Sequence, residues 1–204
     1  SEGTIDALTP AEELEVSYRT RTPVQVGFKP IGERFILHGT SFTGGYDGNG
    51  HTITDIEIDR PTEGYVGLFS RIGGSFMTGS IENIHLNNVD ITGNSQTGSL
   101  AGENYYTITD SMANGEVDGE GNTGGLVGVN SGNIERASSD VTVDGADFRS
   151  GGVAGLNGGS ISESYATGEV SGSRQAGGII GRNSVTVTKS YAAGDVKRHS
   201  AEGG

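Results

Sequence analysis

This sequence of 204 residues contains no cysteine. The absence of cysteine excludes disulfides, thiolate nucleophiles and metal sites with sulfur ligands. No stretch approaches the roughly 20 consecutive apolar residues that cross a bilayer, so we expect no membrane insertion of this chain. Only four prolines are present, and all precede residue 62. Because proline removes a hydrogen bond from a β-ladder, the later sequence is free to form continuous β-structure.

Basic residues are also scarce, since 13 Lys and Arg stand against 26 Asp and Glu and give a formal net charge of −13. This balance excludes nucleic acid as an expected partner, because no basic patch could offset the repulsion from phosphates. An acidic surface with little lysine suits saline, halophilic surroundings, where salt screens self-repulsion. An ordinary acidic surface that keeps an extracellular protein soluble is the alternative. Both interpretations disfavour anionic ligands.

Glycine is abundant, with 37 residues, and much of it belongs to a repeat in the C-terminal half. Each copy ends in an asparagine, which is followed by an apolar residue, a Ser/Ala/Tyr stretch and a valine. Successive repeat asparagines lie 26, 27 and 26 residues apart. A fixed period in this range is typical of stacked units that bury their apolar faces against their neighbours. The copies are TGSLAGEN ending at Asn104, GGLVGVN at Asn130, GGVAGLN at Asn157 and GGIIGRN at Asn183.

Each unit contains three short candidate strands, of the GGLVG, I-x-x-S-Y-A and G-E-V-x-G types, separated by glycines. This arrangement predicts a parallel β-solenoid, and the high glycine content disfavours a helical repeat. We expect a single domain over residues 1–204, with about seven coils that add about 4.8 Å each. A capping box at Thr9-Pro10-Ala11-Glu12 predicts a short helix that caps the first coil. The expected parts are an N-terminal cap (1–23), irregular early coils (24–64), regular repeats (65–198) and a tail (199–204).

In a stack of coils, equivalent residues lie directly above one another. The repeat asparagines would form a ladder at a corner of the solenoid, in which each side-chain amide bonds to the next. The tyrosines of the two S-Y-A sequences would stack likewise. We therefore predict a structural ladder that consists of Asn104, Asn130, Asn157, Asn183, Tyr165 and Tyr191.

The segment from Gly151 to Val170 follows the pattern GGLVG-x-N-x-G-x-I-x-x-S-Y-A-T-G-x-V almost letter for letter. The chain thus resembles the GLUG-repeat family, and FTGGYDGNGHTITDIEI (42–58) is similar to the segment that leads into such repeats in large secreted proteins. The resemblance implies a right-handed parallel β-helix, as in bacterial and archaeal surface proteins, adhesins and the non-catalytic part of immunoglobulin-A-cleaving metallopeptidases. It implies no catalytic residue. The sequence departs from the pattern at Ala137-Ser138-Ser139 and at NSVTVTKS (183–190).

Metallopeptidase chemistry requires an H-E-x-x-H sequence, which this chain lacks. We predict no catalytic residue, no cofactor and no metal site. Glu116, Glu169 and Asp195 share one repeat position, with Thr142 interrupting, and are weak candidates for binding a ligand or cation. Carboxylates on adjacent coils would lie about 5 Å apart, within the range of a retaining glycosidase pair. We interpret them first as a solvated acidic stripe.

These features favour a non-enzymatic β-helix, located extracellularly or at the cell surface, that acts as an adhesin, a spacer or a subunit of a filament or surface assembly. The expected partners are a cell-surface or matrix component, a second copy stacked end to end, or a glycan. The alternative function is that of a polysaccharide-binding module, or of a polysaccharide lyase or hydrolase that uses an acidic face of the β-helix.

Overall fold

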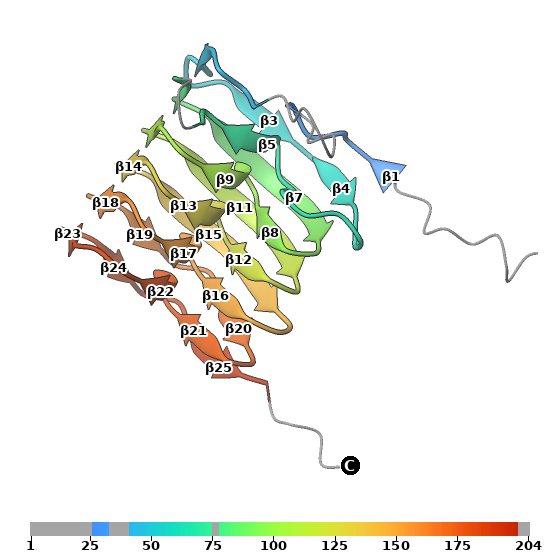
Figure 1. Ribbon diagram of the computed structural model, residues 1–204, viewed down its shortest axis with the longest axis vertical. Helices are drawn as coiled ribbons and strands as arrows, with labels where there is room; N and C mark the ends of the chain where they lie inside the picture. The colour runs from blue at the N-terminus through green and yellow to red at the C-terminus, as the bar shows by residue number, and fades with distance from the viewer. Residues whose placement is uncertain (1–25, 33–40, 75–77, 200–204) are drawn as a thin grey trace, which may run out of the picture.

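The computed structural model describes residues 26–32, 41–74 and 78–199, and these form an all-β structure without helices. Accordingly, none of the described residues belongs to a helix that could span a membrane. The chain winds through four sheets in a fixed order, named I to IV here, and then starts the next turn (Figure 1). Registered residues of successive regular turns lie 26 or 27 positions apart, as Asn104, Asn130 and Asn157 do. The predicted parallel β-solenoid is confirmed.

The strands of each sheet come from successive turns and lie side by side. Sheet I contains β5 (Phe69–Ile72), β9 (Ala101–Asn104), β13 (Val127–Asn130), β17 (Ala154–Asn157) and β22 (Ile180–Asn183). Sheet II contains β2 (Gly45–Asp47), β6 (Ser80–Glu82), β10 (Thr107–Thr109), β14 (Asn133–Glu135), β18 (Ser160–Ser162) and β23 (Val187–Thr188). Sheet IV contains β8 (Gln96–Gly98), β12 (Asn122–Gly124), β16 (Arg149–Gly151) and β21 (Gln175–Gly177).

Sheet III contains the longest strands. Its centre consists of β7 (His85–Gly93), β11 (Met112–Gly119) and β15 (Ser138–Gly145). Before them come β1 (Val26–Gly27), β3 (Thr52–Thr54) and β4 (Glu57–Asp59). After them come β19 (Tyr165–Ala166), β20 (Val170–Gly172), β24 (Tyr191–Ala192) and β25 (Val196–Arg198), so that the single long strand of the central turns is divided in two.

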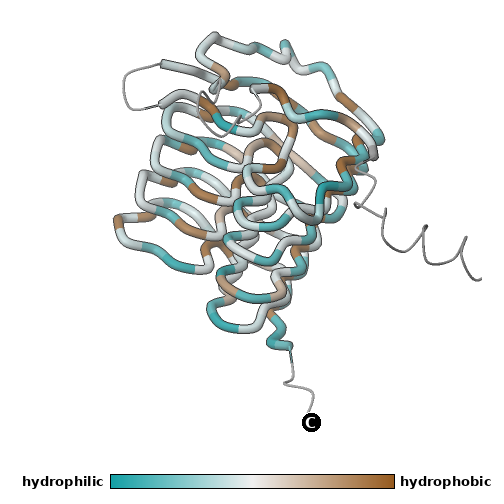
Figure 2. Tube along the Cα trace, turned by 45° about the vertical axis from the view of Figure 1, so that its right-hand side comes forward, coloured by the Kyte–Doolittle hydropathy of each residue, from teal (hydrophilic) through white to brown (hydrophobic). Residues whose placement is uncertain are grey.

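Inward-facing side chains stack into columns, and these columns form one continuous core. Sheet II contributes one fully buried isoleucine per turn, each packed against its registered neighbours. Burying one such side chain contributes about 1.5–3 kcal/mol. Figure 2 shows hydrophobic residues at matching places in successive turns. The column of sheet II is Ile81, Ile108, Ile134 and Ile161, and a column of sheet III is Ile91, Val117, Val143 and Val170.

Glycine inside the strands of sheet I lets this sheet approach sheet IV closely. A Cβ atom on Gly128 would lie 2.5 Å from the backbone nitrogen of Thr97, and one on Gly155 would lie 2.6 Å from that of Thr123. Any side chain at these positions would push the two sheets apart. The last glycine of the GGLVG sequence is therefore required, because the backbones of sheets I and IV approach closely at this position.

Each regular turn contains four strand positions, and not the three that the sequence predicted. The strands of sheet IV were missed because they are three residues long, polar and glycine-rich, with sequences such as Asn-Thr-Gly. The I-x-x-S-Y-A stretch, predicted as one strand, spans the corner between sheets II and III. In the third turn its first part lies in β14 and its second part begins β15.

The described residues form about five turns after one irregular early turn, and not seven coils. The sequence estimate counted several β-like runs before residue 60 as separate coils, whereas β2, β3 and β4 together form a single turn. Irregularity is evident there, because β1 pairs antiparallel with β4 while the other strands pair in parallel. The expected capping helix and the whole N-terminal cap (1–23) lie outside the described residues. The domain boundaries stay predictions.

Candidate functional site on the outward face of sheet III

The outward face of sheet III carries four columns of side chains, which are defined by parallel register and by hydrogen bonds between neighbouring turns. The aromatic column contains His85, Met112, Ser138, Tyr165 and Tyr191. The amide column contains Asn87, Asn114, Asp140 and Thr167. The acidic column contains Glu57, Asp90, Glu116, Thr142, Glu169 and Asp195. The outer column contains Asp59, Thr92, Asp118, Asp144, Ser171 and Lys197.

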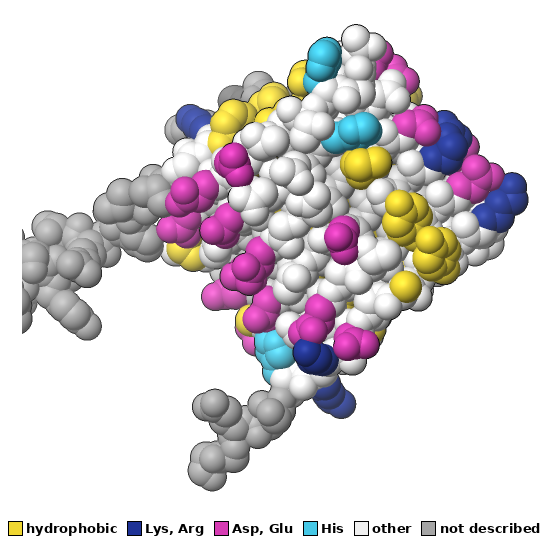
Figure 3. All heavy atoms as spheres, turned by 180° about the vertical axis from the view of Figure 1, so that it is seen from behind, with side chains coloured by type: hydrophobic (Ala, Val, Ile, Leu, Met, Phe, Trp, Pro, Cys, Tyr) yellow, Lys and Arg dark blue, Asp and Glu magenta, His cyan; other side chains and the backbone are white. Residues whose placement is uncertain are grey.

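The acidic column brings the three predicted carboxylate residues into one register, with Thr142 between Glu116 and Glu169. It also contains Glu57 and Asp90, which the sequence did not reveal as members. They were missed because the turns before residue 100 are longer or irregular, so the 26-residue period does not reach them. Figure 3 shows acidic side chains gathered along one side of this face, and hydrophobic ones on the other side.

The carboxylates of the acidic column do not form an isolated catalytic pair. The Nζ atom of Lys197 lies 2.5 Å from an oxygen of Glu169, so that charge is neutralised by an exposed ion pair. Glu116 has Thr142 as its neighbour in the next turn and Asp90 in the preceding turn, so it ends a row of three carboxylates that begins at Glu57. Among the described residues, no group of three His, Cys, Asp or Glu side chains is arranged to hold a metal ion.

Asp118 of the outer column is the carboxyl group with the most perturbed proton affinity. Partial burial and the negative charges of Glu116, Asp144 and Asp90 raise its pKa to about 6. One of its carboxylate oxygens is buried and accepts no hydrogen bond. Asp118 therefore ionises at the cost of desolvation and repulsion. Its carboxyl group consequently keeps its proton up to a higher pH than an ordinary aspartate does.

Tyr165 and Tyr191 lie at the other side of the face, as an aromatic stack. Their ring centroids are 5.3 Å apart and their planes differ by 8°. Both rings are exposed, by 38% and 57% respectively, so the stack forms a ridge on the surface. Since the ring faces cover one another, the free face at the end of the ridge belongs to Tyr191 in the last turn.

The repeat asparagines form a continuous ladder inside the solenoid. The Nδ2 atom of Asn104 donates to Oδ1 of Asn130 at 2.9 Å, and the same contact follows at 2.8 Å and 2.9 Å through Asn157 to Asn183. The Oδ1 atoms of Asn104, Asn130 and Asn183 also accept from the backbone nitrogen two residues later, at 3.1 Å in the case of Asn104 and Tyr106. Three of the four side chains are fully buried, so this ladder stabilises the stack and is not open to a ligand.

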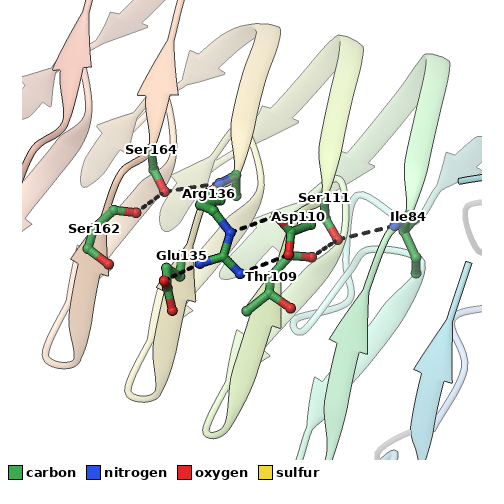
Figure 4. Close-up of polar contacts among 9 residues, drawn as sticks. Ile84, Thr109, Asp110, Ser111, Glu135, Arg136, Ser162 and Ser164 are labelled. Carbon is green, nitrogen blue, oxygen red and sulfur yellow. Dashed lines mark hydrogen bonds and ion pairs between the residues drawn. The ribbon is translucent and has the colours of Figure 1, made fainter. Parts of the chain in front are cut away.

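A second ladder, at the corner between sheets II and III, consists of residues with left-handed backbone conformation. Its members are Asn83, Asp110, Arg136, Glu163 and Lys189, with φ between 48° and 54°. Their side chains pair along the solenoid axis, with Arg136 bound to Asp110 through two contacts of 2.8 Å and 2.9 Å (Figure 4). The Nζ atom of Lys189 lies 2.8 Å from Glu163. We call this set the charged corner.

The charged corner also shifts the pKa values of its acids. The hydrogen bond from Arg136 lowers the pKa of Asp110, and that from Lys189 lowers the pKa of Glu163. Behind the corner, serine hydroxyls bridge the turns, since Ser111 Oγ accepts from the backbone nitrogen of Ile84 at 3.2 Å (Figure 4). The sequence contains a signal for this ladder, because charged residues of alternating sign recur at a spacing of 26 or 27 residues. The sequence prediction used only the apolar, asparagine, tyrosine and acidic positions of the repeat and did not include this one.

Comparison with known proteins agrees with this architecture. A family model described as the GLUG motif matches residues 147–171. The chain carries the GLUG motif. The matched segment runs from the start of β16 through β17, β18 and β19 into β20, so one GLUG motif corresponds to one turn of the solenoid. The predicted resemblance is confirmed.

Two proteins resemble this GLUG-containing chain over different shares of its length. Halomucin of Haloquadratum walsbyi is 36% identical over 89 residues, which are 44% of this chain and 1% of halomucin. A crystal structure from Bacteroides ovatus, provisionally named an immunoglobulin A1 protease, matches 74% of this chain and 51% of its own, with a TM-score of 0.63 and 24% identity. That similarity shows the fold alone. The chain therefore spans a very small part of halomucin and about half of the structural neighbour.

Proposed function

We propose that this chain is a stiff structural module of an extracellular or cell-surface protein, which spaces or presents other surfaces. The observation that carries this proposal is the uninterrupted stacking of turns, held by a buried asparagine ladder and by apolar columns. The similarity to halomucin supports a surface location and a structural role. A more specific version of this function is adhesion to a cell-surface or matrix component, for which an exposed and rigid face is sufficient.

The enzymatic alternative has less support from the geometry. A polysaccharide lyase or hydrolase needs a positioned acid and base, whereas Glu169 is paired with Lys197 and Glu116 lies in an exposed row of carboxylates with Asp90 and Glu57. The name of the Bacteroides ovatus neighbour describes that protein, and the sequence of this chain contains no H-E-x-x-H. A non-enzymatic role thus remains our proposal.

Stacking of a second copy on the last turn is the form of assembly that the geometry favours. The strands of this turn, from β22 to β25, pair only with the preceding turn in the part of the chain that is described. Core-facing Val196 is 48% exposed there, although its equivalent Val170 is completely buried. At the other end β1 already lies antiparallel against β4. A two-fold, tail-to-tail dimer is therefore favoured over an open filament.

Sedimentation velocity and electron microscopy of the native protein test this proposal at low and high salt. We expect rods of twice the single length at high salt, where screening weakens the repulsion between acidic copies. The variant Val187→Asp/Val196→Asp should yield single rods, because it places charges in the stacked end. Val129→Asp, on the outward side of a central strand, is the matched control and should leave the dimer intact. Single rods of the wild-type protein under all conditions would contradict self-stacking, and flexible chains would contradict the structural module itself.

A further inference from the structure

Four arginines in the last turns have no carboxylate partner in the part of the chain that the structure describes. This contrasts with the other paired cations of this acidic protein, such as Arg71 with Glu103, Arg136 with Asp110 and Lys189 with Glu163. Asp147 lies beside this group in sequence, but no ion pair joins it to the arginines among the described residues. The four residues, which we call the arginine cluster, are Arg149, Arg174, Arg182 and Arg198.

Phe148 holds two of these guanidinium groups in place. The Cζ atom of Arg149 lies 4.7 Å from the centroid of the Phe148 ring, and that of Arg174 lies 5.5 Å from it. The ring is 44% exposed, and Arg174 lies on the next turn, where the backbone nitrogen of Gln175 donates to the carbonyl oxygen of Phe148 at 3.1 Å. Cation–π contacts of this kind position an arginine without neutralising it.

Hydrogen bonds to neutral groups hold Arg149 and Arg198. Arg149 donates to the side chains of Asn122 at 2.9 Å and Gln175 at 3.0 Å. Arg198 donates to the carbonyl oxygen of Ser173, directly before Arg174, at 3.2 Å. Partial burial, and then the nearby charge of Arg182, lower the pKa of Arg149. The fold thus concentrates positive charge on this side, held by partners that leave it uncompensated.

The arginine cluster and the acidic column lie on different sheets. Arg149 belongs to β16 of sheet IV, Arg174 directly precedes β21 of that sheet, and Arg182 belongs to β22 of sheet I. In Figure 1 these strands lie on the near side of the molecule, in front of β11 and β15 of sheet III. The net charge of −13 is a sum over the whole chain, so it does not describe the charge of either side by itself. The expectation that anionic ligands are disfavoured was based on the charge of the whole chain, and it did not take account of these arginines.

We propose that the arginine cluster binds an anionic polysaccharide that carries carboxylate or sulfate groups. Guanidinium groups pair with such oxyanions through two parallel hydrogen bonds. Arg149 and Arg174, which share the Phe148 ring, lie on neighbouring turns about 4.8 Å apart. This interval is close to the length of one sugar residue in an extended chain, so a polymer with one charge per sugar matches the cluster. The binding activity does not depend on whether the protein is a spacer or an adhesin.

The test is a titration of the folded protein with polygalacturonate, dextran sulfate and uncharged dextran by isothermal calorimetry. We expect both anionic polymers to bind at about 0.1 M salt and much more weakly at 1 M, where the Debye length is about 3 Å. The variant Arg174→Gln/Arg182→Gln should bind at least about tenfold more weakly, because two charged hydrogen-bonding groups are lost. These two side chains support no described side-chain hydrogen bond, so the variant should keep its melting temperature. Arg136→Gln, at the charged corner, is the matched control and should bind like the wild-type protein.

Four results would overturn the proposal. The first is equal binding of uncharged dextran, and the second is unchanged binding of the anionic polymers to the Arg174→Gln/Arg182→Gln variant. The third is that the wild-type protein binds no polysaccharide but forms dimers, and that the Arg174→Gln/Arg182→Gln variant does not form them. This result would show that the arginine cluster binds carboxylates of a second copy. Tighter binding of a short DNA duplex than of either polysaccharide would likewise reject the glycan as the ligand.

Discussion

The central turns and the last turn have closely similar sequences, yet they differ in burial. Val170 is completely buried whereas Val196 is 48% exposed, and Tyr165 is less exposed than Tyr191 at the equivalent position. The difference arises because a central turn has neighbours on both sides and the last described turn has one. The core side chains of each turn are therefore buried by the adjacent turns. Residues at equivalent repeat positions contribute less to stability in the last described turn than in a central turn.

The largest expected difference concerns the isoleucine column of sheet II. Ile134→Ala, in a central turn, should lower the free energy of unfolding by about 2–5 kcal/mol, because it leaves a cavity between Ile108 and Ile161. Val187→Ala, at the equivalent position of the last turn, should cost less than about 1 kcal/mol, since Val187 is only partly buried. Urea unfolding followed by circular dichroism measures both. Equal losses would show that another molecule covers the last turn under the conditions used.

The asparagine ladder should show a smaller contrast of the same kind. Asn130→Ala leaves the buried Nδ2 atom of Asn104 and the Oδ1 atom of Asn157 without their partner, at a cost of about 1–3 kcal/mol for each unsatisfied group. Asn183→Ala removes a single ladder bond at a partly exposed position and should cost about 1 kcal/mol. Comparison of the two urea midpoints checks this. An Asn183 variant as unstable as the Asn130 variant would contradict the conclusion that a residue contributes more to stability when turns lie on both sides of it.

Acidification should reveal the repulsion around Asp118. Its pKa is raised to about 6 in the folded protein, so the folded state binds a proton more tightly than the unfolded state does. Stability should therefore rise as the pH falls from 7 towards 4, by less than about 1 kcal/mol because the group is largely solvated and screened. Below about pH 4 the lowered pKa values of Asp110 and Glu163 act in the opposite sense, and stability should fall. Melting temperatures of the wild-type protein and Asp118→Asn across this range test the assignment, since the variant should lack the rise between pH 7 and 4.

The smallest effect is expected at the charged corner, where the ion pairs are exposed. Arg136→Ala removes a pair with two contacts to Asp110 and should lower the melting temperature by a small amount. Lys189→Ala, in the last turn, removes one contact to Glu163 and should lower it less. Both losses should shrink in 1 M salt, and thermal melts at two salt concentrations measure them. Losses that salt does not reduce would indicate that backbone conformation, and not charge, dominates the corner.

The repeat period determined most of the fold. Asparagines at a spacing of 26 or 27 residues predicted stacked turns, and they indeed bond to one another through Asn104, Asn130, Asn157 and Asn183. The period also placed Glu116, Glu169 and Asp195 in one column, because parallel stacking converts sequence distance directly into register. Such conversion works wherever the turns are equal in length, and it failed for Glu57 and Asp90, where they are not.

Only the tertiary structure decided how each turn is divided and where charge accumulates. The short strands of sheet IV have no apolar periodicity, and they form because sheet I lies close enough for backbone packing at Gly128 and Gly155. The arginine cluster brings Arg149 and Arg174 together at Phe148, with Arg182 close enough to affect the charge of Arg149, and these residues come from three turns and share no repeat position. Composition reports a sum over the whole chain, whereas binding depends on which charges the fold places side by side.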